Sequence, residues 1–255
     1  MLYGHHKISA FILVGAIVLA VIFFISLFYF KKNKADEVVV IIPEGKTVKE
    51  INSILKQAGV LNIKEDFLSL DKSLEGFLFP DTYKFYKNSN LTIIKEKFLE
   101  NFHKKAEPLL MRNPKNFKRN LILASIIEKE VPDPEDRKIV AGILLKRLLI
   151  NMPLQVDSTL CYIKSQEEAS IDSSKKSCYP IFNKDKEYES SYNTYRYKGL
   201  PPAPISNPGE NAVIAVLDAK ESPFLFYLSN PTSGKTIFSK TLEEHNANKA
   251  KYLSD

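Results

Sequence analysis

Residues 121–148 read LILASIIEKEVPDPEDRKIVAGILLKRL, and this stretch predicts two consecutive helices at the centre of a folded domain. The first ten residues are apolar on every side until the last turn, as in a helix surrounded by protein. Asp133 then has the residue type of a helix N-cap, and Pro134 suits the first position of a new helix. The second helix carries a buried stripe, at Ile139, Val140, Ile143 and Leu144.

Two glutamates, Glu128 and Glu130, end the first of these helices. At about 100° per residue, positions two apart point in nearly opposite directions, so the two cannot act on one bond from a common face. Burial raises the pKa of a carboxyl, and a carboxyl that stays protonated near neutral pH can act as a general acid. Glu128 stacks over two small residues, Ala124 and Ser125, which leave room for a substrate. It is therefore the preferred candidate, with Glu130 second. The alternative for either is an ordinary ion pair, with Lys129, Arg137 or Lys138.

The N-terminal segment Ile8–Phe30 reads ISAFILVGAIVLAVIFFISLFYF and contains no charge. A run of about 20 apolar residues spans a bilayer as a helix. A cleaved signal peptide is the alternative, but its apolar core is shorter, roughly 7–15 residues, and a small-residue cleavage site follows it. This run ends in aromatic residues and lysines, so we expect a retained anchor. Taken alone, the lysines after it slightly favour a cytoplasmic C-terminal domain.

The composition excludes several classes of function. The chain has 255 residues, enough for one or two domains with hydrophobic cores, and a formal net charge of +6. Much of that excess lies beside the apolar segment, so it gives little support for nucleic acid. The sequence shows no glycine-rich phosphate loop and no cysteine–histidine cluster with metal-ligand spacing. We therefore expect no cofactor, no metal and no nucleic-acid partner.

Other local patterns predict the elements around the central helices. Residues 38–42 are β-branched and predict a strand, and residues 48–58 have helical spacing behind Thr47 and Glu50, a capping box. A second short helix is expected near 64–70, and an amphipathic helix over 91–103. Further along we expect a polar surface insertion at 163–190, a mostly ordered loop rich in proline and glycine at 193–212, a short helix at 211–220 and a hairpin between 224–229 and 235–239.

Cys161 and Cys178 are the two cysteines of the chain. The residues alone leave free thiols and a disulfide equally open.

Several motifs, in order along the chain, resemble one family. LILASIIEKE, DRKIVAGILLKRL and MPLQVDSTL are similar to the endolytic murein transglycosylases of the YceG-like family. EGFLFPDTYKF at 75–85 and YNTYRYKGLPPAPISNPG at 192–209 agree with it and are more specific than any single glutamate. The resemblance covers roughly residues 38–253.

The resemblance implies an α+β fold with an N-terminal transmembrane helix, a small LysM-like β/α module and a mixed α+β catalytic domain. The expected boundaries are a tail at 1–7, the transmembrane helix at 8–30, a linker at 31–37, the LysM-like module at 38–74 and the YceG-like catalytic domain at 75–255. It also implies a single-pass protein of the inner membrane with its catalytic domain on the periplasmic side, which outweighs the charge rule. An oxidising compartment then favours a Cys161–Cys178 disulfide.

The activity that the resemblance implies is endolytic cleavage of peptidoglycan. The MurNAc–GlcNAc bond is cleaved within nascent glycan strands, which leaves 1,6-anhydro-MurNAc ends and limits strand length. One glutamate is essential, and we place that role on Glu128. The bilayer and cell-wall synthesis proteins are the further expected partners. Three departures stand out: a single strand–Pro-Glu-Gly–helix unit where the family usually has two, Lys146 where asparagine is common, and the unaligned insertion at 163–190.

Further residues are candidates for binding glycan. They are Glu75, Asp81, Gln155, Asp157, Tyr192, Asn193, Thr194 and Tyr195. Asp157 is the obvious second carboxylate, and if it placed a water molecule the enzyme would be a hydrolase. The alternative is that Asp157 and Asp81 cap turns or helices and that 192–195 is simply a packed loop. Asn207 is expected to fix loop shape. A non-catalytic peptidoglycan-binding scaffold is the remaining alternative function.

Overall fold

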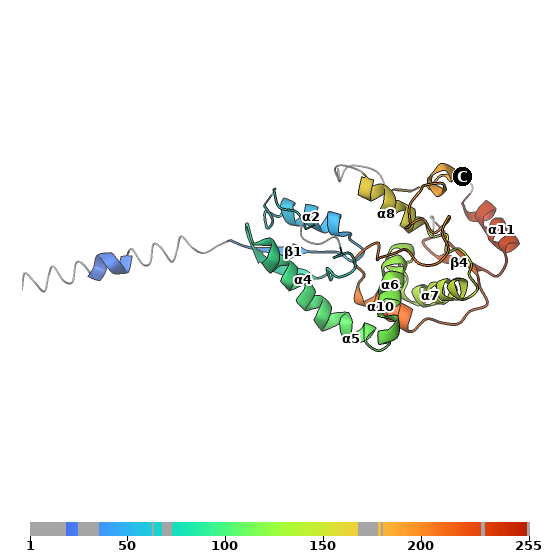
Figure 1. Ribbon diagram of the computed structural model, residues 1–255, viewed down its shortest axis with the longest axis horizontal. Helices are drawn as coiled ribbons and strands as arrows, with labels where there is room; N and C mark the ends of the chain where they lie inside the picture. Colours follow the sequence, from blue (N-terminus) through green and yellow to red (C-terminus); the bar gives the residue numbers. More distant parts are fainter. Residues whose placement is uncertain are drawn as a thin grey trace, which may run out of the picture.

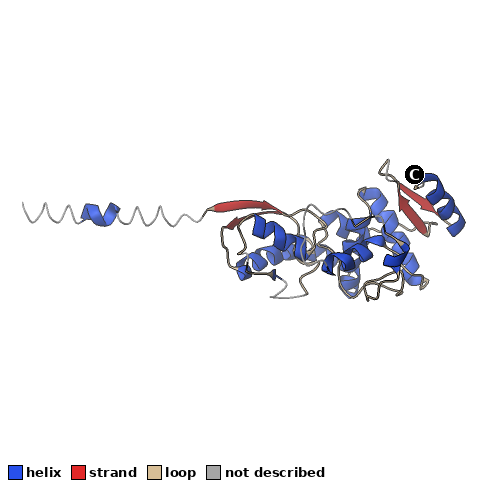
Figure 2. Ribbon diagram, turned by 90° about the horizontal axis from the view of Figure 1, so that it is seen from above, coloured by secondary structure: helices blue, strands red, loops and turns tan. Residues whose placement is uncertain are grey.

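The computed structural model describes residues 19–24, 36–62, 64–67, 73–167, 178–179, 181–230 and 233–253. Within these ranges the chain is a mixed α+β protein in which helices surround two separate two-stranded antiparallel sheets, as expected (Figure 1, Figure 2). The sheets lie at opposite ends of the folded part, with the central helices between them (Figure 2).

The first hydrophobic core forms between a β-ribbon and two helices. Strand β1 (Glu37–Ile41) pairs with β2 (Thr82–Tyr86), and α2 (Val48–Gln57) and α4 (Leu91–Lys105) pack on the ribbon. The predicted capping box is present, because the Thr47 side chain accepts from the amide of Glu50 while the Glu50 carboxylate accepts from the amide of Thr47. This first core includes Phe85 and Phe98, so its packing continues beyond residue 74.

The second core surrounds α6 (Phe117–Glu130), which is preceded by α5 (Glu107–Leu110) and a 3-10 turn, η1 (Pro114–Asn116). Helices α7 (Pro134–Leu149), α8 (Asp157–Glu167) and α10 (Glu210–Leu217) pack against α6 (Figure 1). The predicted N-cap is confirmed, since the Asp133 carboxylate accepts from the amides of Glu135 and Asp136. A Cβ on Gly142 would lie 1.9 Å from the carbonyl oxygen of Lys220, so only glycine allows this approach to α7.

The predicted hairpin is also confirmed. Strand β3 (Phe226–Ser229) pairs with β4 (Thr236–Ser239), and the final helix α11 (Leu242–Tyr252) packs on both strands. The short helix α9 (Asn183–Lys186) lies within the predicted insertion at 163–190, of which residues 168–177 and 180 are outside the described ranges.

The predicted membrane anchor falls mostly outside the described residues. Of 8–30, the structure describes 19–24, which are helical. Among the described residues, the structure contains no helix with the length and apolar character needed to cross a bilayer. Of the helix predicted at 64–70, residues 64–67 are described, and a helix begins at Phe67.

Candidate functional site

The two glutamates at the end of α6 lie in different surroundings, as their spacing predicted. Glu128 is turned toward the first core and the start of α10, whereas Glu130 is turned toward the start of α8 and strand β3. The partners of each carboxyl group decide what it can do chemically.

Glu128 is an ion-paired side chain with 5 % of its surface exposed. Its Oε1 accepts a hydrogen bond from Arg137 Nη2 at 2.7 Å, and its Oε2 accepts from the amide of Gly209 at 2.9 Å. Arg137 is itself buried and donates through Nε to the carbonyl oxygen of Val131 at 2.7 Å. The turn at Gly45 lies against the Glu128 side chain, because a Cβ there would be 3.3 Å from Glu128 Cγ. Glu128 therefore joins α6, α7, the start of α10 and the β1–α2 turn, and the ion pair requires its ionised form.

Glu130 receives hydrogen bonds from two neutral groups instead. The amide of Ser158 donates to Oε1 at 3.1 Å, and the hydroxyl of Tyr227 donates to Oε2 at 3.1 Å. Burial raises the pKa of Glu130, and the negative charge of Asp157 adds to the rise, although the bonds from Ser158 and Tyr227 oppose it. A carboxyl group with these surroundings is suited to hold a proton.

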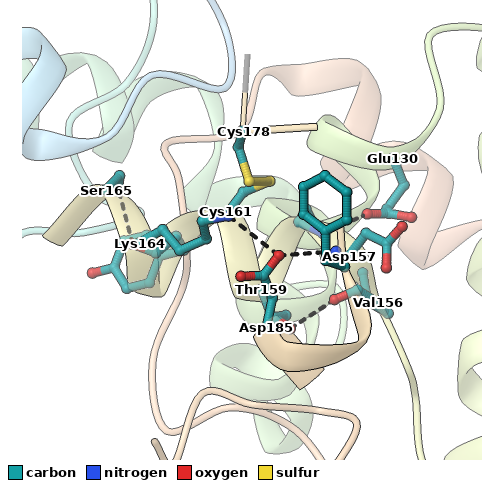
Figure 3. The surroundings of a disulfide bond; sticks show 12 residues. Glu130, Val156, Asp157, Thr159, Cys161, Lys164, Ser165, Cys178 and Asp185 are labelled. Atoms are coloured by element: carbon teal, nitrogen blue, oxygen red, sulfur yellow. Dashed lines mark hydrogen bonds and ion pairs between the residues drawn. A yellow bond between two sulfur atoms is a disulfide. The ribbon is translucent and has the colours of Figure 1, made fainter. Parts of the chain in front are cut away.

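Asp157 is the first residue of α8 and lies next to Glu130 (Figure 3). Its Oδ1 accepts a short hydrogen bond from the hydroxyl of Tyr195. Burial and the charge of Asp157 raise the pKa of Tyr195, so the phenol remains a donor. We call Glu130, Asp157, Ser158, Tyr195 and Tyr227 the Glu130 cluster; it brings together residues from α6, α8, the 192–209 loop and β3.

Arg147, in the last turn of α7, supports the same region. It is 4 % exposed, and it donates to the carbonyl oxygens of Leu225 at 2.7 Å and Leu154 at 2.6 Å. Its guanidinium group also lies 5.1 Å from the ring centroid of Phe226. Because it holds the start of β3 and the segment before α8, it fixes the elements that carry Tyr227 and Asp157.

Glu75 is a second buried carboxyl group, at the boundary between the two cores. It accepts from the amide of Val48 at 3.1 Å, at the start of α2, and burial raises its pKa to about 8. The ring centroids of Tyr162 and Tyr192 lie 5.0 Å apart beside it, and burial together with the charge of Glu75 raises the pKa of both phenols. Glu75 and Tyr192 thus share one location, separate from the contacts of Glu130.

Asn207 connects the same boundary through its side chain, which is fully buried. Its Oδ1 accepts from the amides of Gly76 at 2.9 Å and Leu78 at 2.8 Å. Its Nδ2 donates to the carbonyl oxygen of Lys46 at 2.8 Å and to Glu75 Oε1 at 3.1 Å. The expectation that Asn207 fixes loop shape is confirmed.

The remaining predicted glycan-binding residues have other surroundings. Thr194 is buried, and its hydroxyl accepts from the amide of Val156 at 3.0 Å. Asn193 is buried and donates to the carbonyl oxygens of Lys186, at the end of α9, and Tyr188. Gln155 is exposed and has a positive φ of 49°, and its amide donates to the carbonyl oxygen of Thr194. Asp81 pairs with Lys105 at 2.7 Å in the first core region.

Two features of the site have no clear signal in the sequence. Tyr227 lies 97 residues after Glu130, in a strand whose alternation does not single it out. The amide of Ser158 carries no signal in the side-chain pattern. The expected disulfide between Cys161 and Cys178 is confirmed, with an S–S distance of 2.05 Å, and it lies beside the Glu130 cluster (Figure 3). Within the described ranges, no group of three or more histidine, cysteine or acidic residues could hold a metal ion.

Comparisons with known proteins agree with this architecture. The model of the YceG-like family matches residues 26–251. An endolytic murein transglycosylase of Bacillus subtilis is 34 % identical over 185 residues, which are 71 % of this chain and 48 % of that protein. One of Streptococcus pneumoniae is 29 % identical over 184 residues, 71 % of this chain and 32 % of that protein.

A crystal structure of a yceG-like protein from Listeria monocytogenes superposes with a TM-score of 0.69 at 31 % identity, covering 86 % of this chain and 78 % of that one. This chain therefore spans about half the length of the Bacillus relative and about a third of the streptococcal one. Because the family model matches most of its residues, the chain belongs to the YceG-like family.

Proposed function

We propose that this protein is a lytic transglycosylase that cleaves peptidoglycan strands internally, with Glu130 as its general acid. The family membership and the names of the relatives support the reaction class. The observation that carries the choice of residue is the surroundings of Glu130, a partly exposed carboxyl whose pKa is raised by burial and which accepts hydrogen bonds from two neutral donors.

Glu130 replaces Glu128 in this role because a general acid must carry a proton before the reaction. The ion pair of Glu128 with Arg137 exists only while Glu128 is ionised, and both of its oxygens already accept hydrogen bonds. Protonation would leave the buried cation of Arg137 without its carboxylate partner. Glu128 is better suited to hold α6, α7 and α10 together.

The proposed reaction needs one acid and no water. Protonated Glu130 donates its proton to the oxygen that links MurNAc to GlcNAc, and the bond from that oxygen to the MurNAc C1 breaks. The ionised Glu130 then takes the proton of the MurNAc C6 hydroxyl, whose oxygen bonds to C1. One glycosidic bond is thus replaced by one intramolecular glycosidic bond, the 1,6-anhydro linkage, and Glu130 ends protonated as it began.

Asp157 assists as a neighbouring carboxylate. It lies beside Glu130 and is held by Tyr195, so its negative charge can stabilise the oxocarbenium-like state at C1. The same position favours one alternative, in which Asp157 orients a water molecule and the enzyme is a hydrolase.

The remaining parts of the proposal concern where the reaction takes place. Residues 8–30 anchor the chain in the inner membrane, and 38–74 act as a LysM-like module before the catalytic domain at 75–255, on the outer side. The apolar character of 8–30 and the Cys161–Cys178 disulfide, which suits an oxidising compartment, support this arrangement. Nascent glycan strands are the proposed substrate, and cell-wall synthesis proteins are proposed partners.

Digestion of purified glycan strands tests the proposal. Wild type should release products with 1,6-anhydro ends, lighter by one water than hydrolysis products when weighed by mass spectrometry. Glu130→Gln should abolish release, and Glu128→Gln, assayed below its unfolding temperature, should keep measurable activity. Products with reducing ends would establish the hydrolase. If the wild-type protein binds glycan strands but releases no products, the alternative of a non-catalytic peptidoglycan-binding scaffold would be favoured.

A further inference from the structure

The Cys161–Cys178 disulfide holds an aromatic side chain beside the Glu130 cluster. Asp157 and Cys161 are four residues apart in α8, so they lie on the same face of that helix. The disulfide brings the Cα atoms of Cys161 and Cys178 to 5.5 Å, and Tyr179 follows directly. The chain therefore places Tyr179 on the side of α8 that carries Asp157.

The electrostatics of Tyr179 agree with this position. Its pKa is raised by burial and by the negative charges of Glu130 and Asp157. The residue nevertheless keeps 48 % of its surface exposed. A tyrosine that is within reach of the charges of Glu130 and Asp157 and keeps about half of the residue's surface exposed can be contacted by a ligand bound at the Glu130 cluster.

The chemistry of such a surface suits a sugar. A pyranose ring presents a face of C–H groups, which packs on an aromatic ring, and its hydroxyl and acetamido groups can bond to a phenol. We propose that Tyr179 contacts the N-acetylhexosamine next to the scissile bond, and that the Cys161–Cys178 disulfide is the device that positions it. This inference rests on the proposed function, because it needs glycan at the Glu130 cluster.

Without the disulfide, Tyr179 is connected to α8 only through the long chain segment that follows the helix. The two cysteines are 17 positions apart, and bringing the ends of such a segment together costs chain entropy. Because the disulfide closes this segment when the protein folds, glycan binding does not have to offset the entropy of closure. Breaking the bond should therefore weaken binding through Tyr179.

Affinity for uncrosslinked glycan strands tests the role of Tyr179, measured calorimetrically on the full chain in detergent. All variants carry Glu130→Gln, so that the strands stay intact. Tyr179→Ala should weaken binding roughly 3- to 10-fold, as expected for one lost aromatic contact, whereas Tyr179→Phe should stay within about 2-fold. Tyr86→Ala is the matched control, since Tyr86 is a half-exposed tyrosine at the end of β2, in the β1–β2 sheet and away from the Glu130 cluster. Unchanged affinity for Tyr179→Ala would overturn the inference.

A mutant cycle tests the role of the disulfide. Replacing both cysteines by serine should weaken binding about as much as Tyr179→Ala, and adding it to Tyr179→Ala should change affinity little further, because both changes remove one contact. A phosphine reductant should reproduce the loss with the cysteines present and have no effect on the serine variant. Independent, multiplicative effects would show that the disulfide only stabilises the fold.

Digestion by wild type separates this inference from the proposed function. If wild type releases no products, the proposed function fails. If wild type is active while Tyr179→Ala has an unchanged KM, only the role of Tyr179 fails.

Discussion

The buried carboxyl of Glu75 predicts that the protein loses stability as the pH rises from about 5 to about 9. Glu75 is 7 % exposed, and burial raises its pKa from 4.5 to about 8. Between these values the folded protein holds a proton that the unfolded chain has released, so a higher pH favours unfolding. The stabilisation is complete below 4.5 and is lost as the pH rises through about 8. At about 1.36 kcal/mol per pH unit, the rise from 4.5 to about 8 corresponds to about 5 kcal/mol.

Urea unfolding of wild type and Glu75→Gln at about pH 5 and at about pH 9 measures this effect. Glutamine is neutral throughout and keeps an oxygen for the amide of Val48. The free energy of unfolding of wild type, taken relative to the variant, should fall by several kcal/mol between about pH 5 and about pH 9, with about 5 kcal/mol as the upper bound. Glu96→Gln, at an exposed position of α4, is the control and should change stability by less than about 0.5 kcal/mol at either pH. An equal difference between wild type and Glu75→Gln at both pH values would refute a neutral buried Glu75.

Three further predictions follow from other contacts. Glu128→Gln should destabilise the fold by about 3 kcal/mol in thermal unfolding, because the buried cation of Arg137 loses its partner; an unchanged Tm would contradict the structural role of the pair. Gly142→Ala should destabilise by about 2 kcal/mol or more, since its Cβ would overlap the Lys220 carbonyl oxygen, and urea unfolding measures it. Tyr227→Phe removes a hydrogen bond that lowers the pKa of Glu130, so the alkaline limb of the pH–activity profile should move to higher pH; a move to lower pH would argue against Glu130 as the acid.

Local signals in the sequence predicted most of the elements near the site. The apolar run before Glu128, the cap at Asp133, the capping box of Thr47 and Glu50, and the β3–β4 hairpin all depend on neighbours within a few residues. The opposite directions of Glu128 and Glu130 follow from helix geometry alone. These features required no knowledge of the tertiary structure.

The choice between the two glutamates could not be made in that way. Their partners are distant in sequence: Gly209 lies 81 residues from Glu128, and Tyr227 lies 97 residues from Glu130. The small residues beneath Glu128 indicated room for a ligand, but Ala124 and Ser125 are fully buried, and Ser125 bonds to Ile205 and Ser206. Likewise, the pairing of β1 with β2 joins residues on either side of α2, which local periodicity cannot reveal.

The buried amide of Asn207 limits what evolution can place at this position. It offers two acceptor bonds and two donor bonds at once, to main-chain groups and to Glu75. Aspartate has no donor, leucine has neither donor nor acceptor, and glutamine is one methylene longer. In a homologous sequence without asparagine there, the segments at Lys46, Gly76 and Leu78 consequently need other hydrogen-bond partners, however closely the rest of the chain aligns.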